Sequence, residues 1–356
     1  MTKPRILITA AAGKTGFATA MQLLEKDYPV RALVRRQSPR AEQLKKAGAE
    51  LFLGNMHDIR DLRQAMDGVQ RAYYCPPFGP NLLHASMMFA VAAEEAKLEV
   101  VTKMTQWFSA PLHESHVTRE HWLTDQTMPW MPNVDVITIN PALFAEFYLL
   151  VVAPVAQLGL LPMPLGDGDA GKNAPPSNED IASVAVGTLM DPAPHIGKSY
   201  RPTGPELLSP NDIAGILGNV VGRNVKYMDV PPIMFVKAAL LQGFPMPEIF
   251  HARLYGGDQA LGTTAVNGPT EIVREIGGRE PESFESIARR YYANHPDAVR
   301  SIGNKLRAMA FFARLMLKRA PNMDRYARDQ HFPLIKNPVP PIETGEWLAT
   351  HSNGAL

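Results

Sequence analysis

The sequence predicts an α/β protein built on a doubly wound parallel sheet with helices on both faces. Two observations support this fold class. Within residues 6–139, short apolar runs typical of strands alternate with helical patterns, which is the order that a parallel sheet requires. In addition, the first strand runs into small residues at 9–16 and then into a helix, as in folds that bind dinucleotides at a strand-to-helix turn.

Six strands and five helices are expected in this part of the chain. Apolar runs predict strands at 6–8, 30–34, 51–53, 71–75, 98–102 and 134–139. Helical spacing between them predicts helices at 13–26, 40–47, 59–66, 82–96 and 117–128. Because ligands of such sheets bind beyond the carboxyl ends of the strands, the segments that follow the strands are expected to face one crevice.

The small residues after the first strand predict a cradle for the pyrophosphate of a dinucleotide. Small side chains let the backbone approach phosphates closely, and the following helix offers its unpaired N–H groups. Ala10 stands where the three-glycine pattern has its first glycine, and alanine fits there only if its φ stays negative. The residues expected to contact the cofactor here are Thr9, Ala11, Gly13, Lys14, Thr15 and Gly16.

Two arginines follow the second strand and indicate which dinucleotide binds. Arg35 and Arg36 lie about twenty residues past the cradle, where an enzyme that uses the cofactor without a 2′-phosphate has an acidic residue for the ribose. Guanidinium groups instead bind phosphate oxygens in pairs. We therefore expect NADP(H), with the alternative that the two arginines are a solvated loop.

The loops after the later strands are expected to complete the cofactor site. The loop after the third strand would lie near the adenine, and the loops after the fifth and sixth near the nicotinamide. The expected contact residues are Asn55, Met56, Pro76, Pro77, Phe78, Gln106, Trp107, Asn140, Pro141 and Phe144.

Composition excludes some classes of function. The chain has 356 residues and a formal net charge of +1, which gives no support for nucleic-acid binding driven by charge. Cys75 is its only cysteine, so an internal disulfide framework and a cysteine-built metal site are excluded. With no signal-peptide pattern at the start, we expect a cytoplasmic protein.

The order of these motifs resembles the NmrA-like family of atypical short-chain dehydrogenases. The resemblance rests on Ala-x-x-Gly-Lys-Thr-Gly at 10–16, Val34-Arg35, Gly54-Asn55-Met56, Gln106-Trp107 and the run 140–144, and it covers about Arg5 to Tyr292. It implies a Rossmann-type NADP-binding domain at 1–150 and a smaller α/β substrate region at 151–295. Residues 296–356 then form a helical and Pro-rich extension. The family includes reductases as well as cofactor-sensing regulators.

The proton donor of ordinary short-chain dehydrogenases is missing. None of the ten tyrosines is followed four residues later by lysine, so no ammonium makes a phenol acidic in the usual way. His116 and His121 are the candidate catalytic acids, with the alternative that both are structural. His113 and His116 are one residue short of the zinc-protease spacing, so we expect no metal site.

Aromatic residues gather near the expected crevice and favour an apolar or aromatic substrate. We expect about half of them to be ordinary core. The apolar segment 141–165 contains Glu146, Gln157 and four prolines, so it is interpreted as the floor of a pocket rather than a bilayer span. The aromatic candidates are Tyr73, Phe78, Trp107, Phe108, Phe144, Phe147 and Tyr148.

The extension contains a helical pattern at 299–319 with an apolar face and a basic side. We expect it to dock on its own domain as a lid or to form a homodimer, in preference to lying on an anionic membrane. The apolar face is made of Ile302, Leu306, Met309, Ala313, Met316 and Leu317, and Phe312 widens it.

Two functions from different classes remain. The favoured hypothesis is an NADPH-dependent oxidoreductase that transfers hydride to an apolar, aromatic or quinone-like acceptor, with a histidine or water supplying the proton. The alternative is a non-catalytic sensor that binds NADP(H) and signals to a protein partner. Isomerase or lyase chemistry with a retained cofactor is a third hypothesis.

Overall fold

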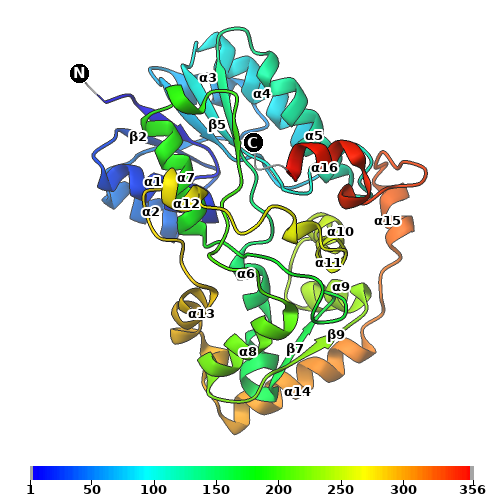
Figure 1. The fold of residues 1–356 in the computed structure, drawn as a ribbon. Coiled ribbons are helices and arrows are strands. Elements are labelled where there is room, and N and C mark those ends of the chain that lie inside the picture. The colour runs from blue at the N-terminus through cyan, green and yellow to red at the C-terminus, as the bar shows by residue number, and fades with distance from the viewer. Residues whose placement is uncertain (1–2, 353–356) are drawn as a thin grey trace.

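Residues 3–352 are described by the computed structural model, in which seven parallel strands form the main sheet (Figure 1). The strand order is β3-β2-β1-β4-β5-β6-β8, so the order reverses between β1 and β4. This confirms the predicted fold class, and β8 adds a strand that the sequence did not predict. The strands are β1 (Ile6–Ile8), β2 (Val30–Val34), β3 (Glu50–Leu53), β4 (Arg71–Tyr74), β5 (Val100–Met104), β6 (Asp135–Ile139) and β8 (Ser199–Tyr200).

Helices cover both faces of the main sheet because its strands present apolar side chains to both. Ile6 and Ile8 belong to the cluster beneath α1 and α7, whereas Leu7 points to the opposite cluster beneath α3 and α4. One face carries α1 (Lys14–Glu25), α2 (Pro39–Lys46) and α7 (Asn178–Met190). The other carries α3 (Ile59–Met66), α4 (Leu82–Glu95), α5 (His116–Thr127) and η1 (Met128–Trp130).

A second, smaller sheet forms in the lower part of the molecule (Figure 1). Its two parallel strands, β7 (Leu160–Met163) and β9 (Lys226–Asp229), pack with helices around a separate apolar cluster. The helices around it are α6 (Ala145–Tyr148), η2 (Leu149–Val151), η3 (Pro154–Leu158), α8 (Pro210–Val221) and α13 (Phe284–Ala293). The other elements are α9 (Pro232–Leu241), α10 (Met246–Ala252), α11 (Tyr255–Ala260), η5 (Thr263–Ala265) and α12 (Ile272–Glu275), which packs on α7, with η4 (Ala193–His195) before β8.

The C-terminal extension runs along both parts of the molecule. It starts with η6 (Pro296–Ala298) and α14 (Ile302–Leu317), which lies along the lower edge against η3 and α9. It then returns to the main sheet through α15 (Met323–Asp329), η7 (Pro341–Glu343) and α16 (Gly345–His351), where Trp347 packs on Trp107.

The orientation of α14 corrects the sequence prediction. Asn304, Ala308 and Leu315 are the residues of α14 that are buried, and they lie on the side that was predicted to be basic and exposed. The face predicted to dock points into solvent, since Ile302 is 81% exposed and Leu317 is 85% exposed. The buried residues pack against η3 and α9, whose surfaces supply the apolar partners.

Within residues 3–352, none of the helices combines the length and the apolar character needed to cross a bilayer.

Candidate functional site

The turn between β1 and α1 has the shape of a pyrophosphate cradle. The carbonyl oxygen of Ala10 accepts a hydrogen bond from the amide of Gly13 at 2.7 Å. A Cβ atom on Gly16 would lie 2.5 Å from the same oxygen, and one on Gly13 would lie 2.9 Å from it. Only glycine therefore allows the backbone to close at these two positions.

The backbone conformation of Ala10 differs from the prediction. Its φ is +46°, in the left-handed region, whereas the sequence analysis required a negative φ for alanine at this position. An L-residue with a Cβ is strained there by about 1–2 kcal/mol. The turn keeps the backbone path that a glycine would give, and the strain falls on the one residue that replaces it.

The amino end of α1 is free to bind an anion. Gly13 is its N-cap and supplies no side-chain hydrogen bond, so the first N–H groups of the helix have no cap. The hydroxyl of Thr15 accepts from the Tyr73 hydroxyl at 2.9 Å, and that of Thr9 accepts from the Cys75 amide at 2.9 Å. Thr15 thus braces the start of α1 against β4, and Thr9 braces the end of β1 against the loop after β4, so the hydroxyl groups of both are already bonded within the protein.

A cavity of about 340 Å³ opens beside the cradle, between the ends of β2 and β3. Arg35 and Arg36 lie in its wall with Ser38, and the described residues that line it include no carboxylate. This donor set suits a phosphate group on the ribose. Of the other predicted residues, Gly13, Asn55, Met56 and Pro77 also line this cavity.

His57 is a residue of this cavity that the sequence analysis missed. It lines the wall beyond Asn55, and its pKa is lowered by burial first and then by the positive charges of His84 and Arg35. Arg40 adds to the same positive region, because its guanidinium donates to the Gly13 carbonyl at 3.1 Å. The sequence signal that could have identified His57 is its position two residues after Asn55, in a loop at the carboxyl edge of the sheet.

The apolar loop after β4 connects this cavity with a second one. Pro76 is buried, Pro77 lines the cavity beside the cradle, and Phe78 is 37% exposed and lines an apolar cavity in the lower part of the molecule. Consecutive residues of one loop thus line the two cavities.

The loops after β5 and β6 are more buried than predicted. Gln106 donates to the Tyr255 hydroxyl at 2.6 Å and accepts from the Thr118 hydroxyl at 3.1 Å. Trp107 is fully buried, donates to the Thr263 carbonyl and packs on Trp347, so its indole belongs to the core and not to a cavity wall. The cofactor contact expected of Trp107 stays a prediction.

The remaining predicted residues lie near the carboxyl edge, where Asn140 and Gln106 line a separate cavity of about 510 Å³. Ala11 is fully buried, and Asn140 and Pro141 are also buried. Phe144 is the N-cap of α6 and packs against the main-sheet core, and Lys14 is ion-paired with Glu146 of α6.

His116 lies in an aromatic cluster away from the cradle. Its ring is 4.6 Å from the ring of His251 and 4.4 Å from that of Phe332, and burial lowers its pKa to about 4. Its Nδ1 atom has no hydrogen-bond partner among the described residues. The side chain is therefore neutral near pH 7.

His121 lies in a buried polar network on α5. Its Nδ1 atom is 3.3 Å from the Thr105 hydroxyl, which donates to Asp125 at 2.9 Å. Asp125 also forms an ion pair with the fully buried Lys103 and accepts from Ser109 at 2.6 Å. Burial lowers the pKa of His121 to about 4, so it holds little of the charged acid at neutral pH.

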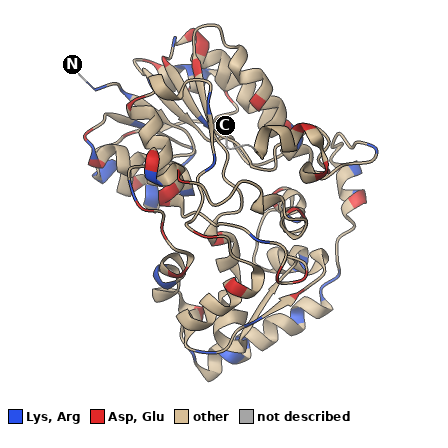
Figure 2. Cartoon of the chain, viewed as in Figure 1, with Lys and Arg blue, Asp and Glu red and all other residues tan. Residues whose placement is uncertain are grey.

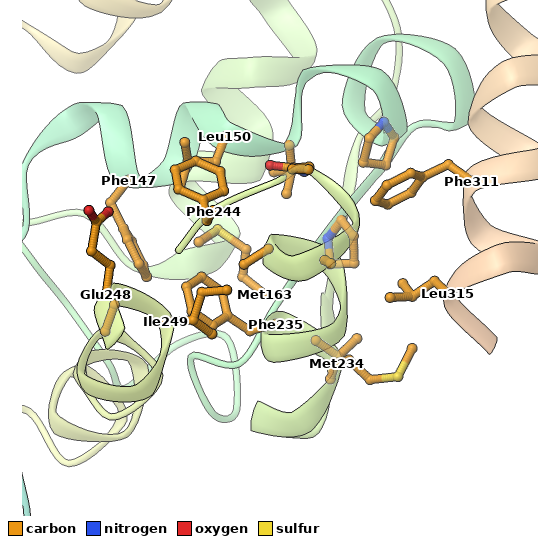
Figure 3. A pocket seen from close by; sticks show the side chains of 18 of the residues that line it. Phe147, Leu150, Met163, Met234, Phe235, Phe244, Glu248, Ile249, Phe311 and Leu315 are labelled. Carbon is orange, nitrogen blue, oxygen red and sulfur yellow. The ribbon is translucent and has the colours of Figure 1, made fainter. Parts of the chain in front are cut away.

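The apolar cavity has a volume of about 220 Å³ and lies between α9, α10 and α14 (Figure 3). Phe147 and Met163 come from the segment predicted to form a pocket floor, and Phe311 and Leu315 come from α14. Glu248 is the one ionisable residue among its described lining, and burial raises the pKa of that carboxyl. Of the other aromatic candidates, Tyr73, Trp107, Phe108 and Tyr148 are buried in the core.

Residues 2–125 match the model of the NmrA-like family. The match lies in the N-terminal part of the chain. The match covers the cradle, Arg35, Arg36 and the loop at 76–78, and it confirms the family predicted from the sequence.

Similarity extends beyond the NmrA-like segment. An NAD(P)H azoreductase of Xenophilus azovorans is 26% identical over 289 residues, which cover 81% of this chain and 98% of that protein. Among solved structures, an NADPH-dependent quinone oxidoreductase of Escherichia coli in complex with NADPH has a TM-score of 0.68 at 21% identity, over 81% of this chain and 99% of that one. The triphenylmethane reductase of Citrobacter sp. in complex with NADP(H) has a TM-score of 0.68 at 19% identity, over 80% and 99%. At these identities the two solved structures support the fold.

Proposed function

We propose that the chain is an NADPH-dependent oxidoreductase that reduces an apolar small molecule. One observation carries the proposal: Pro77 and Phe78 are consecutive, and they line the cofactor cavity and the apolar cavity respectively. The first cavity would take the adenosine end of the cofactor, so the nicotinamide would have to extend past this loop toward the apolar cavity, where the hydride donor and its acceptor would meet.

The cofactor suits the residues of the first cavity. The uncapped amino end of α1 would bind the pyrophosphate, and Arg35, Arg36 and Ser38 would hold the 2′-phosphate. NADPH would supply a hydride from its nicotinamide ring. The names of the similar proteins agree with such a role, since they include an azoreductase, a quinone oxidoreductase and a triphenylmethane reductase.

The second cavity favours a substrate with aromatic or extended apolar parts. Phe147, Phe235 and Phe311 contribute rings to its wall, and Glu248 and Gln242 are its polar residues. A carboxyl group with a raised pKa can donate a hydrogen bond or a proton to the substrate. We propose Glu248, or water beside it, as the proton source in place of the two buried histidines.

The test is oxidation of NADPH, followed by absorbance, with a panel of quinones, azo compounds and triphenylmethane dyes. Turnover by the full-length chain is expected with at least one class, and Ala238→Trp, which narrows the apolar cavity, is expected to raise KM. Lys237→Trp is the matched control, because Lys237 is on α9 outside the described cavity wall. Tight NADPH binding without oxidation by any acceptor would overturn the proposal and favour the sensor.

A further inference from the structure

One helix of this chain presents a large apolar face to solvent. On α14, Ile302, Leu306 and Met309 are 81%, 60% and 51% exposed, and Met316 and Leu317 are 60% and 85% exposed. Scattered single apolar residues are ordinary on protein surfaces, but five on one face of a 16-residue helix form a patch.

The opposite face of α14 is already occupied. Asn304 donates from its amide to the Val299 carbonyl at 2.6 Å, and Ala308 and Leu315 are buried against the helices beneath. At 3.6 residues per turn these positions lie about half a turn from Ile302 and Leu306. The contact with the body of the protein therefore fixes the apolar face outward.

Basic residues flank the apolar face on both sides. Helical spacing places Lys305 along one side of it, and Arg307 and Arg314 along the other. From Ala298 to Met323 the sequence contains six Lys and Arg residues and no Asp or Glu. Figure 2 shows this part of the lower edge with blue segments along α14.

We propose that α14 lies on the surface of a membrane that contains anionic phospholipids. A helix with an apolar face between two basic flanks places its apolar side chains at the level of the acyl chains and its cations beside the headgroup phosphates. Arg300, Lys318 and Arg319, at the two ends of the helix, extend the cationic surface. Contact of this kind needs no spanning segment.

The charges favour a membrane over a second copy of the chain as the occupant. In a two-fold dimer through this face, the flanking Lys305, Arg307 and Arg314 of one copy would approach those of the other. No carboxylate within residues 298–323 is available to pair with them. Like charges brought together at the rim of an interface oppose association, whereas anionic lipids neutralise them.

The experiment is co-sedimentation of the full-length chain with vesicles. We expect binding to vesicles of phosphatidylcholine with phosphatidylglycerol, and at least tenfold weaker binding to phosphatidylcholine alone. The double variant Leu306→Glu/Met309→Glu is expected to lose at least tenfold in affinity for the anionic vesicles. Salt at 0.5 M, which gives a screening length on the order of 4–5 Å, is expected to weaken the binding of the wild-type protein to these vesicles.

Matched controls separate surface chemistry from misfolding. Trp130→Glu removes another exposed apolar residue, 76% exposed on η1, and is expected to bind vesicles like the wild type. Circular dichroism and NADPH binding of the double variant report its fold and its cofactor cavity, which lies outside α14. Analytical ultracentrifugation gives the oligomeric state of each protein.

Three results would overturn the proposal. These are absence of sedimentation with anionic vesicles, sedimentation that the double variant leaves unchanged, and a wild-type dimer that the double variant converts to monomer. Failure of NADPH oxidation would contradict the proposed function and leave this result intact, because vesicle binding needs neither cofactor nor substrate.

Discussion

The ammonium of Lys14 lies 2.5 Å from the Oε2 atom of Glu146, so the lysine of the cradle is bound by a carboxylate from α6. The other oxygen of that carboxylate accepts from the side-chain amide of Asn178 at 2.5 Å. A lysine held in this way is a weaker phosphate donor than its place in the motif suggests. Its charge is partly balanced before the cofactor arrives.

Glu146→Gln is therefore expected to tighten NADPH binding. The amide keeps the shape and removes the counter-charge, and since half-exposed ion pairs contribute up to about 1 kcal/mol, the gain is within about fivefold. Isothermal titration calorimetry measures it. Glu179→Gln, on α7 and paired with Arg290, is the control. Unchanged or weaker binding in Glu146→Gln would mean that Lys14 does not contact the phosphates.

We expect the selectivity for the 2′-phosphate to depend on Arg35 and Arg36, which line the cavity beside the cradle. Loss of both side chains removes charge-assisted hydrogen bonds of about 1.5–3 kcal/mol each, so the affinity for NADPH is expected to fall at least tenfold. The affinity for NADH is expected to change less than twofold. Fluorescence titration of Arg35→Ala/Arg36→Ala with both nucleotides tests this. An equal loss of affinity for NADPH and NADH would show that these arginines do not bind the 2′-phosphate.

Ala10→Gly is expected to stabilise the protein by about 1 kcal/mol, because glycine adopts a φ of +46° without strain. Chemical denaturation measures the free energy of unfolding. Ala12→Gly in the same turn is the control, since Ala12 is not among the described residues with positive φ. Glycine there is expected to destabilise by up to about 1 kcal/mol. Equal effects in the two variants would contradict the strain at Ala10.

Stability is expected to fall as the solution becomes acidic. His121 has a pKa of about 4 in the folded protein against 6.5 when unfolded, so the unfolded state binds more protons between these values. Stability is full above about pH 6.5 and is lost as the pH falls toward 4, by about 2 kcal/mol at pH 5 for this one residue. His116, with a pKa of about 4, adds to the loss.

Denaturation at pH 7.5 and 5.0 tests this dependence. In His121→Gln the difference between the two pH values is expected to shrink, whereas His331→Gln, at an exposed position, leaves it unchanged. The same His121 variant tests the catalytic prediction. Retained kcat would show that His121 is part of the structural network around Asp125. Loss of kcat with normal NADPH affinity would show that His121 is a catalytic residue.

Glu248→Gln is expected to lower kcat at least tenfold if the carboxyl donates the proton. Glutamine fills the same space in the apolar cavity but has no acidic proton, so KM is expected to change little. Steady-state kinetics across pH 5–9 measures both. Gln242→Ala, at the other polar position of the cavity wall, is the control. Unchanged kcat in Glu248→Gln would leave water as the donor.

The sequence predicted the main sheet well because its signals are local. Strands 6–8 and 30–34 and helix 59–66 agree with the structure at both ends, since each combines an apolar pattern with a nearby breaker or cap. Ser38 and Asp58, for example, cap α2 and α3 with their side chains. The strands β7 and β9 were not predicted, because a two-stranded sheet depends on pairing between segments about 65 residues apart.

The candidate site was predicted less completely because burial is a tertiary property. Arg35 and Arg36 reach the expected cavity, since a strand end fixes their position. Trp107 also follows a strand end, yet Trp347 from the extension packs on it and encloses it. His121 faces a strand end, and the ion pair of Lys103 with Asp125 lies in the network that encloses it. Those partners are 240 and 18 residues away in the chain, beyond any local pattern.

The adjacency of Pro77 and Phe78 has a thermodynamic consequence. The two residues share one peptide unit, so a backbone movement at Pro77 also displaces Phe78, and proline holds its own φ near −65°. A nucleotide that shifts this dipeptide changes the affinity of the apolar ligand, and the ligand must change the affinity of the nucleotide by the same factor. Binding at the two cavities is then a single linked equilibrium rather than two separate ones.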